Sequence, residues 1–218
     1  TGAGTEPSTK PVPNVGVDST GDAAADATTG TDGLYALPNL GGNVTVRSLP
    51  KFGTPRASDH NDAVTSFDAL LIARKAVRLI SLTGKQQLAG DASGNGVVTA
   101  YDAGLVSQFA AQVVGHLPVA TIKGSDWQFL RCDGYPVCTN PTYTYTPLSG
   151  PETANFYAIL FGDVSGNWVK VSTLASMAAT SPTTQVEAEF IEKDRVAAAQ
   201  LAGSNAVSPV RAPGPVSF

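Results

Sequence analysis

The stretch at residues 90–113, GDASGNGVVTAYDAGLVSQFAAQV, constrains the fold more than any other part of the chain. Counted from Asp91, residues with side-chain oxygens stand at the first, third, fifth, ninth and twelfth positions. They are Asp91, Ser93, Asn95, Thr99 and Asp102, and Val97 stands at the seventh position, where a carbonyl oxygen would serve. A chain that wraps one large, hard cation offers alternate side chains and needs glycine, here Gly96, where it turns sharply. The pattern predicts such a loop followed by a helix.

This spacing is that of an EF-hand calcium loop, so the expected ion is calcium (Ca2+). The general pattern has Asp or Asn at the third position and Glu at the twelfth, where this chain has Ser93 and Asp102. The alternative interpretation is an Asn-Gly turn before a helix that Thr99 caps. That interpretation gives no reason for the alternation of oxygen-bearing side chains.

A shorter copy of the pattern lies upstream, at residues 58–77. The aligned ligands are Asp59, Asn61, Thr65 and Asp68, which match Asp91, Ser93, Thr99 and Asp102 in order. The helices that follow the two loops also match in register. The upstream loop is shorter and lacks the glycine, so its backbone must turn differently, with Asp62 as an additional candidate ligand.

Two calcium loops, each followed by a helix, resemble dockerins, the modules that bind cohesin domains in extracellular bacterial and archaeal assemblies. The resemblance covers residues 53–115 and implies one calcium ion at the upstream ligands and another at the downstream ligands. The positions just before the last ligand, often hydroxyl residues in cellulosomal dockerins, are Ser66 with Phe67 and Ala100 with Tyr101. This departure argues against a cellulosomal cohesin as the partner.

Residues 11–50 contain short strand-like segments separated by Asp-Gly and Gly-Gly turns. They resemble the end of a carboxypeptidase regulatory-like domain, which is a small immunoglobulin-like sandwich. The matching residues are Gly33, Tyr35, Leu37, Leu40, Gly42, Thr45 and Val46. The apolar strand that usually opens such a sandwich is missing, because Gly, Thr, Ser and Pro stand in its place.

Residues 118–170 return to strand-like patterns in DWQFL, TYTYTPL and ANFYAILFGDV. The block ends in GDVSGNW, a signature that often closes it in families that join a regulatory-like sandwich to a dockerin-like pair. Asp163, Ser165 and Asn167 repeat the opening of the downstream loop and form a third candidate metal set. No terminal carboxylate follows them, so the alternative is a turn packed under Trp168.

The expected fold is therefore mainly β with a small α part. An immunoglobulin-like β-sandwich is expected at residues 1–53 and a dockerin-like EF-hand helix pair at residues 54–117. A β-strand block is expected at residues 118–170. Residues 171–218, rich in Ala, Ser, Thr and Pro, form a C-terminal extension and a candidate assembly segment.

Composition favours an exported protein. Charged residues make up only 15% of the chain and the net charge is −4, without a basic cluster, which argues against nucleic-acid and anionic-membrane partners. No apolar run is long enough to span a bilayer. Cys132 and Cys138 bracket a short turn and are expected to form a disulfide in an oxidising, extracellular compartment. Asn43 opens an N-glycosylation sequon.

No arrangement of residues predicts catalysis, because neither His60 nor His116 stands in a motif that activates a nucleophile. Two functions remain. The first is an extracellular structural subunit that polymerises into a filament or surface layer when a neighbour's strand, from residues 1–17 or 184–191, completes the sandwich. The second is a dockerin-type module that anchors the chain to a cohesin-like partner.

Overall fold

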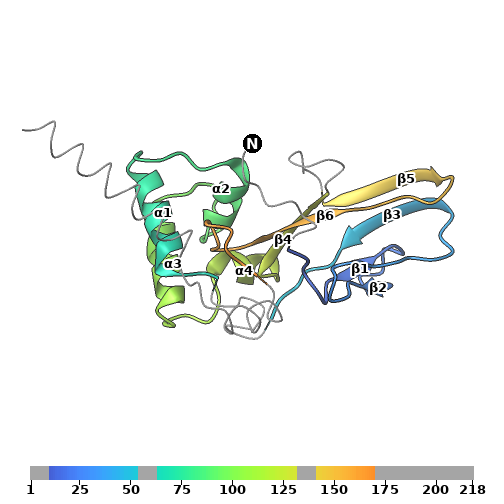
Figure 1. The fold of residues 1–218 in the computed structure, drawn as a ribbon, viewed down its shortest axis with the longest axis horizontal. Helices are drawn as coiled ribbons and strands as arrows, with labels where there is room; N and C mark the ends of the chain where they lie inside the picture. The colour runs from blue at the N-terminus through green and yellow to red at the C-terminus, as the bar shows by residue number, and fades with distance from the viewer. Residues whose placement is uncertain (1–9, 54–62, 132–140, 170–218) are drawn as a thin grey trace, which may run out of the picture. The chain divides into compact units, whose positions relative to one another are not determined.

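The computed structural model describes residues 10–53, 63–131 and 141–169 (Figure 1). In chain order the elements are β1 (Gly16–Asp18), β2 (Ala27–Thr28), β3 (Gly42–Ser48), α1 (Ser66–Ala76), α2 (Gly84–Gly90), α3 (Ala100–Ala110), α4 (Pro118–Lys123), β4 (Trp127–Arg131), β5 (Thr142–Leu148) and β6 (Phe156–Leu160). All strand pairs are antiparallel. More of these residues are helical than extended, so the described part is mixed α and β and not mainly β.

The two predicted helices are confirmed as α1 and α3. Thr65 caps α1 and Thr99 caps α3, each through a capping box with the Asp three positions later. The helices pack against each other (Figure 1), with Ile72 and Val106 fully buried in a shared core. Val113, the last residue of the stretch expected to form the loop and the second helix, follows the end of α3 and is 72% exposed.

Two short helices were not expected from the sequence. α2 begins after Thr83, whose side chain accepts from the N–H of Gln86, and its C-cap is Asp91, the first residue of the predicted calcium loop. α4 begins with a proline in its first turn, and its C-cap is Gly124, which has a φ of 60°. These helices place the start of the loop against the core of the α1–α3 pair.

One sheet joins segments that are far apart in the sequence. Its strand order is β2-β1-β3-β5, and Val44 and Val46 of β3 lie opposite Tyr145 and Tyr143 of β5. The sheet therefore combines residues from the expected sandwich at 1–53 with residues from the expected block at 118–170. Its hydrophobic cluster has four buried members, namely Val17, Val44, Val46 and Tyr143.

The second sheet pairs β4 with β6 and shares the larger core with the helices. The N–H of Gly162, just after β6, donates to the carbonyl of Ala89 in α2 over 2.7 Å. This bond holds the segment that follows β6 against the helices. Before β4, the N–H of Gly53 donates to a carboxylate oxygen of Asp126 over 2.8 Å.

The strand expected within residues 31–40 is absent, since that segment forms turns and extended chain without a ladder. Tyr35 and Leu37 nevertheless pack on the smaller core, and the Tyr35 hydroxyl donates to the carbonyl of Ala154 over 2.6 Å. Asn43 lies exposed at the start of β3. No helix among the described residues is both long and apolar enough to cross a membrane. Cys132, Cys138 and residues 171–218 lie outside the described ranges.

Candidate functional site: three half-loops at the helix pair

The loop after α2 folds back around the carboxylate of Asp91. One carboxylate oxygen accepts from the Ser93 hydroxyl at 3.3 Å and from the N–H groups of Gly94 and Asn95, both at 3.0 Å. The other oxygen accepts from the N–H of Gly96 at 2.8 Å. The first predicted ligand therefore lies at the centre of the turn.

Glycine is required at two positions of this turn. Gly96 has a φ of 86°, as the sequence pattern predicted, and Gly94 has a φ of 76°. Both values lie in the left-handed region, which side chains with a Cβ rarely adopt. Gly94 is also close to Val119, because a Cβ placed on it would lie 3.3 Å from that side chain.

The loop closes on the last predicted ligand, Asp102, whose side chain is fully buried. One oxygen accepts from the N–H of Ser93 at 2.9 Å, and the other from the N–H and the hydroxyl of Thr99 at 2.8 and 2.9 Å. Burial alone would raise the pKa of Asp102, but these hydrogen bonds outweigh it and lower the pKa below its ordinary value. Thr99 thus caps α3 and also lies beside the last carboxylate.

The remaining residues that were predicted to ligate the ion lie on the exposed side of the loop. The side-chain oxygen of Asn95 accepts from the N–H of Val97 at 2.9 Å, and Val97 is 57% exposed. Val98 turns inward and is buried, and its carbonyl accepts from the Lys75 ammonium at 2.7 Å. The sequence-predicted residues 91–102 therefore come together as one oxygen-lined turn.

The upstream set is described only in its second half, because Asp59, Asn61 and Asp62 lie outside the described ranges. Asp68 is fully buried, and one of its oxygens accepts from the N–H and the hydroxyl of Thr65 at 2.9 and 3.0 Å. This arrangement reproduces that of Thr99 and Asp102. The alignment of the two helix starts is therefore confirmed.

The third set folds like the first half of the downstream loop. One carboxylate oxygen of Asp163 accepts from the Ser165 hydroxyl at 3.1 Å and from the N–H groups of Gly166 and Asn167 at 2.7 and 3.1 Å. Its other oxygen accepts from the N–H of Trp168 at 3.1 Å. The fourth residue, Gly166, has a φ of 69°, like Gly94 at the same place in the other turn.

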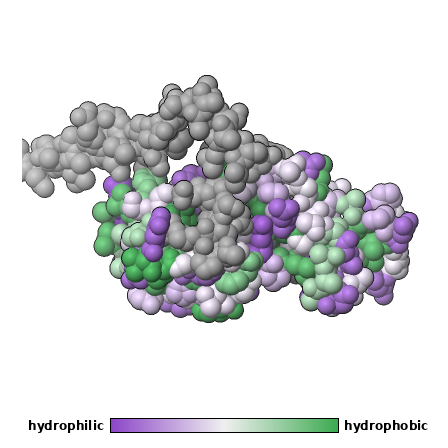
Figure 2. Space-filling model, turned by 90° about the horizontal axis from the view of Figure 1, so that it is seen from below, coloured by the Kyte–Doolittle hydropathy of each residue, from purple (hydrophilic) through white to green (hydrophobic). Residues whose placement is uncertain are grey.

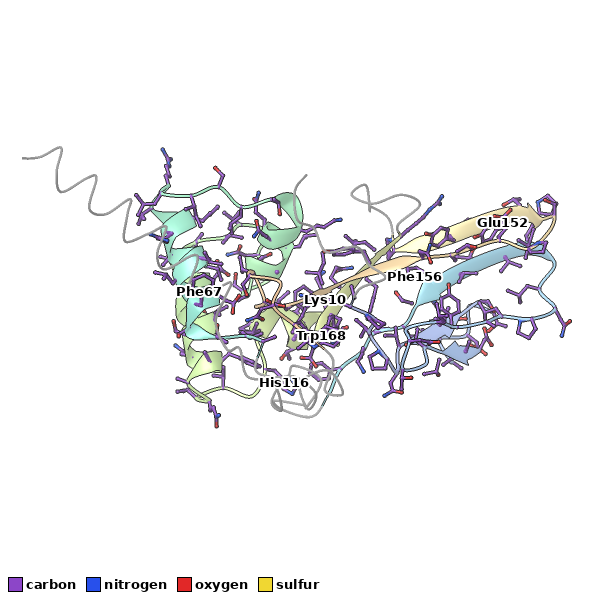
Figure 3. The ribbon with its side chains drawn as sticks, viewed as in Figure 1. Lys10, Phe67, His116, Glu152, Phe156 and Trp168 are labelled. Carbon is purple, nitrogen blue, oxygen red and sulfur yellow. The ribbon has the colours of Figure 1, made fainter. Side chains whose placement is uncertain are left out.

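Trp168 anchors this third turn. Its side chain is 5% exposed and packs edge-on against Trp127 of β4, with ring centroids 5.1 Å apart. Figure 3 labels Trp168, together with Lys10, in this region. The turn packed under Trp168, which was the alternative interpretation of GDVSGNW, is therefore present.

The structure brings the third turn to the start of α1, a contact that sequence reasoning missed. The N–H of Ser165 donates to the free oxygen of Asp68 over 2.8 Å. Burial, and then the negative charge of Asp68, raise the pKa of Asp163 to about 6, while hydrogen bonds from Trp168, Asn167 and Ser165 oppose the rise. Burial likewise raises the pKa of Asp68. Two buried carboxylates therefore lie close enough here for the charge of one to act on the other.

One basic side chain lies near this carboxylate pair. The ammonium of Lys10 donates to the carbonyl of Gly166. Burial lowers the pKa of Lys10, and the negative charge of Asp163 partly offsets that effect. Within the described ranges, however, no Lys, Arg or His forms a salt bridge with Asp68 or Asp163.

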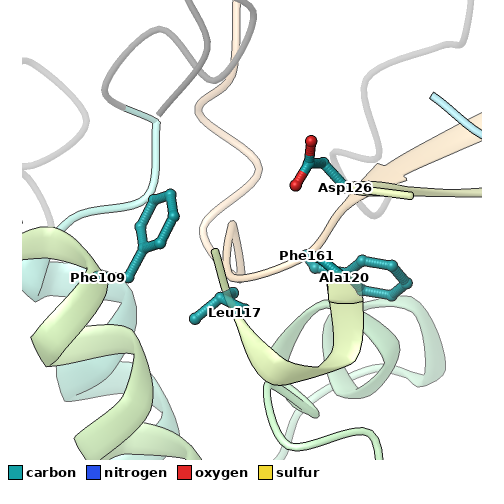
Figure 4. Close-up of a pocket in the computed structure, with 5 residues that line it drawn as sticks. All are labelled: Phe109, Leu117, Ala120, Asp126 and Phe161. Carbon is teal, nitrogen blue, oxygen red and sulfur yellow. The ribbon is translucent and has the colours of Figure 1, made fainter. Parts of the chain in front are cut away.

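A separate polar cluster surrounds Asp126, which lines a small pocket with four apolar residues (Figure 4). His116 Nδ1 lies 3.3 Å from one oxygen of Asp126, and the His116 ring stacks on Phe52 at 4.5 Å. The other oxygen accepts from the N–H of Gly53, and Ser125 bonds to Lys51. These contacts fix the chain between β3 and the helices.

No protein-family model, curated protein or solved structure shows significant similarity to this chain. Within the described ranges, no three His, Cys, Asp or Glu side chains come together. The three segments described above, residues 91–102, 65–68 and 163–167, instead combine Asp with Ser, Asn and Thr. These are all oxygen donors, the type that calcium prefers over nitrogen or sulfur.

Proposed function

We propose that this chain is an extracellular calcium-binding structural module and has no catalytic role. The observation that carries the proposal is the turn at residues 91–102, which gathers two carboxylates and the oxygens of Ser93, Asn95 and Thr99. Asp91, Ser93, Asn95 and Asp102 would hold the ion, with Val97 and Thr99 at the positions that contribute a carbonyl and a water-mediated contact. The bound ion would neutralise the buried charge of Asp102 and cross-link the start of α3 to the end of α2.

Calorimetric titration of calcium into chelator-treated protein tests this proposal. With only two carboxylates in the loop, the expected Kd is on the order of 10⁻⁵ to 10⁻³ M, as in extracellular modules. Asp91→Asn should abolish binding at this loop. Asp22→Asn, which removes an exposed carboxylate far along the chain from the loop, is the matched control and should leave the titration unchanged. Absence of any calcium binding by the wild type would refute the proposal.

We further propose that the chain is the subunit of a filament or surface polymer. The sheet β2-β1-β3-β5 would be one layer of an immunoglobulin-like sandwich that a neighbouring subunit completes. The small size of its core supports this, because among the described residues only four members of this cluster are buried and the hydrophobic residues packed against them are only partly buried, which is little for a layer that must bury one whole face. Of the two segments expected to be exchanged, residues 16 and 17 already pair within their own chain in β1. Residues 1–9 and 184–191 lie outside the described ranges.

Light scattering and negative-stain microscopy, with calcium and with chelator, test the polymer. Particles much larger than the 22.3 kDa chain, which disassemble when calcium is removed, are the expected result. Deleting residues 1–9 or residues 184–191 should identify the exchanged segment. A monodisperse monomer at high protein concentration with calcium would contradict the polymer, whatever the result of the calcium titration.

A cohesin-like partner is the second candidate function, favoured by exposed apolar residues on the helix pair. Tyr101, at a partner-facing position in dockerins, is 65% exposed, and Leu70 on α1 is 47% exposed. Several strongly hydrophobic residues are also visible over the helical end in Figure 2. A pull-down with cohesin domains, repeated with Tyr101→Ala, separates this function from self-assembly. Capture that the substitution abolishes would favour anchoring.

The extracellular location has its own tests. Intact-mass measurement without reductant should show a mass lower by two hydrogens than that of the reduced chain, if Cys132 and Cys138 are joined. Asn43, exposed on β3, should carry a glycan in the native material. Two free thiols would place the protein in a reducing compartment and contradict the proposed location.

A further inference from the structure

Two turns in this protein present the same donors to two equivalent helix starts. In the downstream site both halves come from one continuous loop, residues 91–102. At α1 the second half, Thr65 and Asp68, meets a first half that comes from residues 163–167, after β6. In each case the third residue of the turn donates its N–H to the carboxylate at the helix start, at 2.9 Å from Ser93 and at 2.8 Å from Ser165.

We propose that Asp163, Ser165 and Asn167 combine with Thr65 and Asp68 to form a composite calcium site. This inference rests on the proposed calcium site at residues 91–102 and adds a second ion. It joins residues that the sequence pattern assigned to two different ions. It also gives the third turn the terminal carboxylate that its own sequence lacks.

The two buried carboxylates at this place, those of Asp68 and Asp163, favour the binding of a cation. The Asp68 side chain is fully buried and that of Asp163 is 8% exposed, and neither is in a salt bridge within the described ranges. Burying one charge without a partner is unfavourable, and two of the same sign are more so. A divalent cation between the two carboxylates would neutralise both and would accept the neighbouring hydroxyl and amide oxygens as ligands.

The third position of the loop decides between the composite site and the continuous one at residues 59–68. In that continuous alignment, Asn61 would take the place that Ser93 has beside Asp102. The structure has Ser165 there, with its N–H on Asp68. One carboxylate oxygen of Asp68 is thereby committed to the third turn and the other to Thr65.

The composite site departs from the downstream loop at its sixth position. Trp168 stands where Gly96 stands in the other turn, and the described residues record no left-handed φ for Trp168. The third turn therefore lacks the sharp left-handed turn that, in the downstream loop, precedes the carbonyl of the seventh residue. We expect fewer protein ligands than in the downstream loop, hence weaker binding.

Counting bound calcium by equilibrium dialysis of the full chain tests the inference. The wild type should bind two ions, while Asp163→Asn and Ser165→Ala should each lose the weaker ion and keep the tighter one. Asp91→Asn should lose the tighter ion and keep the weaker one. Asp59→Asn, the matched control, should leave both in place.

Terbium luminescence provides a second measurement that does not depend on the folding of any variant at the composite site. Trp168 lies within the composite turn, whereas the aromatic residue beside the downstream loop is Tyr101. Excitation selective for tryptophan should therefore give terbium emission that persists in Asp91→Asn and that excess calcium displaces. Absence of this emission while terbium is bound would overturn the inference.

The outcomes separate this inference from the calcium proposal on which it rests. One bound ion, lost in Asp91→Asn and kept in Asp163→Asn, would retain the downstream site and overturn the composite site. Loss of the weaker ion in Asp59→Asn but not in Asp163→Asn would return the second ion to the continuous loop. A wild type that binds no calcium would refute both. Lys10→Gln, which removes the nearby ammonium, should tighten the weaker site if the composite site is correct.

Discussion

The N–H of Ser165 donates to the carboxylate of Asp68 over 2.8 Å, although 97 positions of chain separate the two residues. The same contact between Ser93 and Asp102 spans nine positions. The entropy cost of closing a loop grows with its length, so bringing the two halves of the downstream loop together costs less than bringing residues 163–167 to α1. The halves at α1 meet only when the segment after β6 has reached the helix, so this contact ties the helix pair to the β4–β6 sheet.

Calcium is expected to raise the melting temperature. An ion that binds only the folded protein stabilises it by about 2.7 kcal/mol per site when free calcium is one hundred times Kd. For a protein of this size that corresponds to about 5 to 10 °C. Differential scanning calorimetry in calcium and in EGTA measures the shift, with magnesium at equal concentration as the control. An unchanged melting temperature would count against calcium as a structural element.

Substituting alanine for a glycine in the loop and for one in the helix should have opposite effects on the stability of the protein. Gly96→Ala should destabilise the protein by about 1 to 2 kcal/mol, because its φ of 86° is unfavourable for alanine. Gly104→Ala, in the interior of α3, should stabilise it by about 0.5 to 1 kcal/mol. A Cβ placed on either glycine would meet no atom of another part of the chain within 4 Å, so the backbone conformation decides whether each substitution stabilises or destabilises. Urea unfolding in calcium measures them.

The downstream loop and its helix could be predicted because all their determinants are local. The spacing of Asp91, Asn95 and Asp102, the glycine at position 96 and the apolar period of the helix lie within one continuous segment. The same local reasoning placed Asp59 and Asn61 ahead of Thr65, since an alignment proceeds along the chain. Nothing local indicates that residues 163–167 reach α1.

Two complementary gaps in the sequence could have suggested this pairing. The loop at residues 59–68 has a terminal carboxylate but lacks a glycine turn. The turn at residues 163–167 has Gly166 but lacks a terminal carboxylate. Each segment supplies what the other lacks, which is a signal that becomes visible only when the two are compared.

The fold was less predictable where local signals are weak. α2, GKQQLAG, has little apolar periodicity and depends on the Thr83 cap and on the burial of Ala89. The segment at residues 31–40 alternates like a strand, yet it contains Gly33 and Pro38 and docks its side chains without a ladder. In both cases tertiary packing outweighs the sequence pattern.

The ion pair between the buried Asp18 and the partly exposed Arg47 in the β-sheet should make stability depend on pH. Burial would raise the pKa of Asp18, but hydrogen bonds from the Gly21 N–H and the Arg47 guanidinium, with further N–H donors, lower it to about 2. An Asp with a lowered pKa in the folded state stabilises fully above pH about 4, and this contribution is lost as the pH falls towards 2.

Thermal melts of wild type and Asp18→Asn in EGTA, from neutral pH down to pH about 2, isolate this contribution. Asp18→Asn should cost about 2 kcal/mol at neutral pH, because it removes charge-assisted bonds to Arg47. The difference between the two proteins should shrink as the pH falls. Asp22→Asn, an exposed carboxylate in the adjacent turn, should change stability by less than about 0.5 kcal/mol. A difference that is constant with pH would contradict the assignment.

Trp168 should contribute more to stability than any exposed aromatic residue of the helix pair. Its ring packs edge-on against Trp127 and is 5% exposed, so Trp168→Ala should cost about 3 to 5 kcal/mol. Tyr101→Ala, at a residue that is 65% exposed, is the control and should cost less than about 0.5 kcal/mol. Because Trp168 closes the turn that carries Asp163, its loss should also weaken the second calcium ion while leaving the first in place. Equal costs for the two substitutions, measured by urea unfolding in calcium, would show that the third turn is not anchored by this ring.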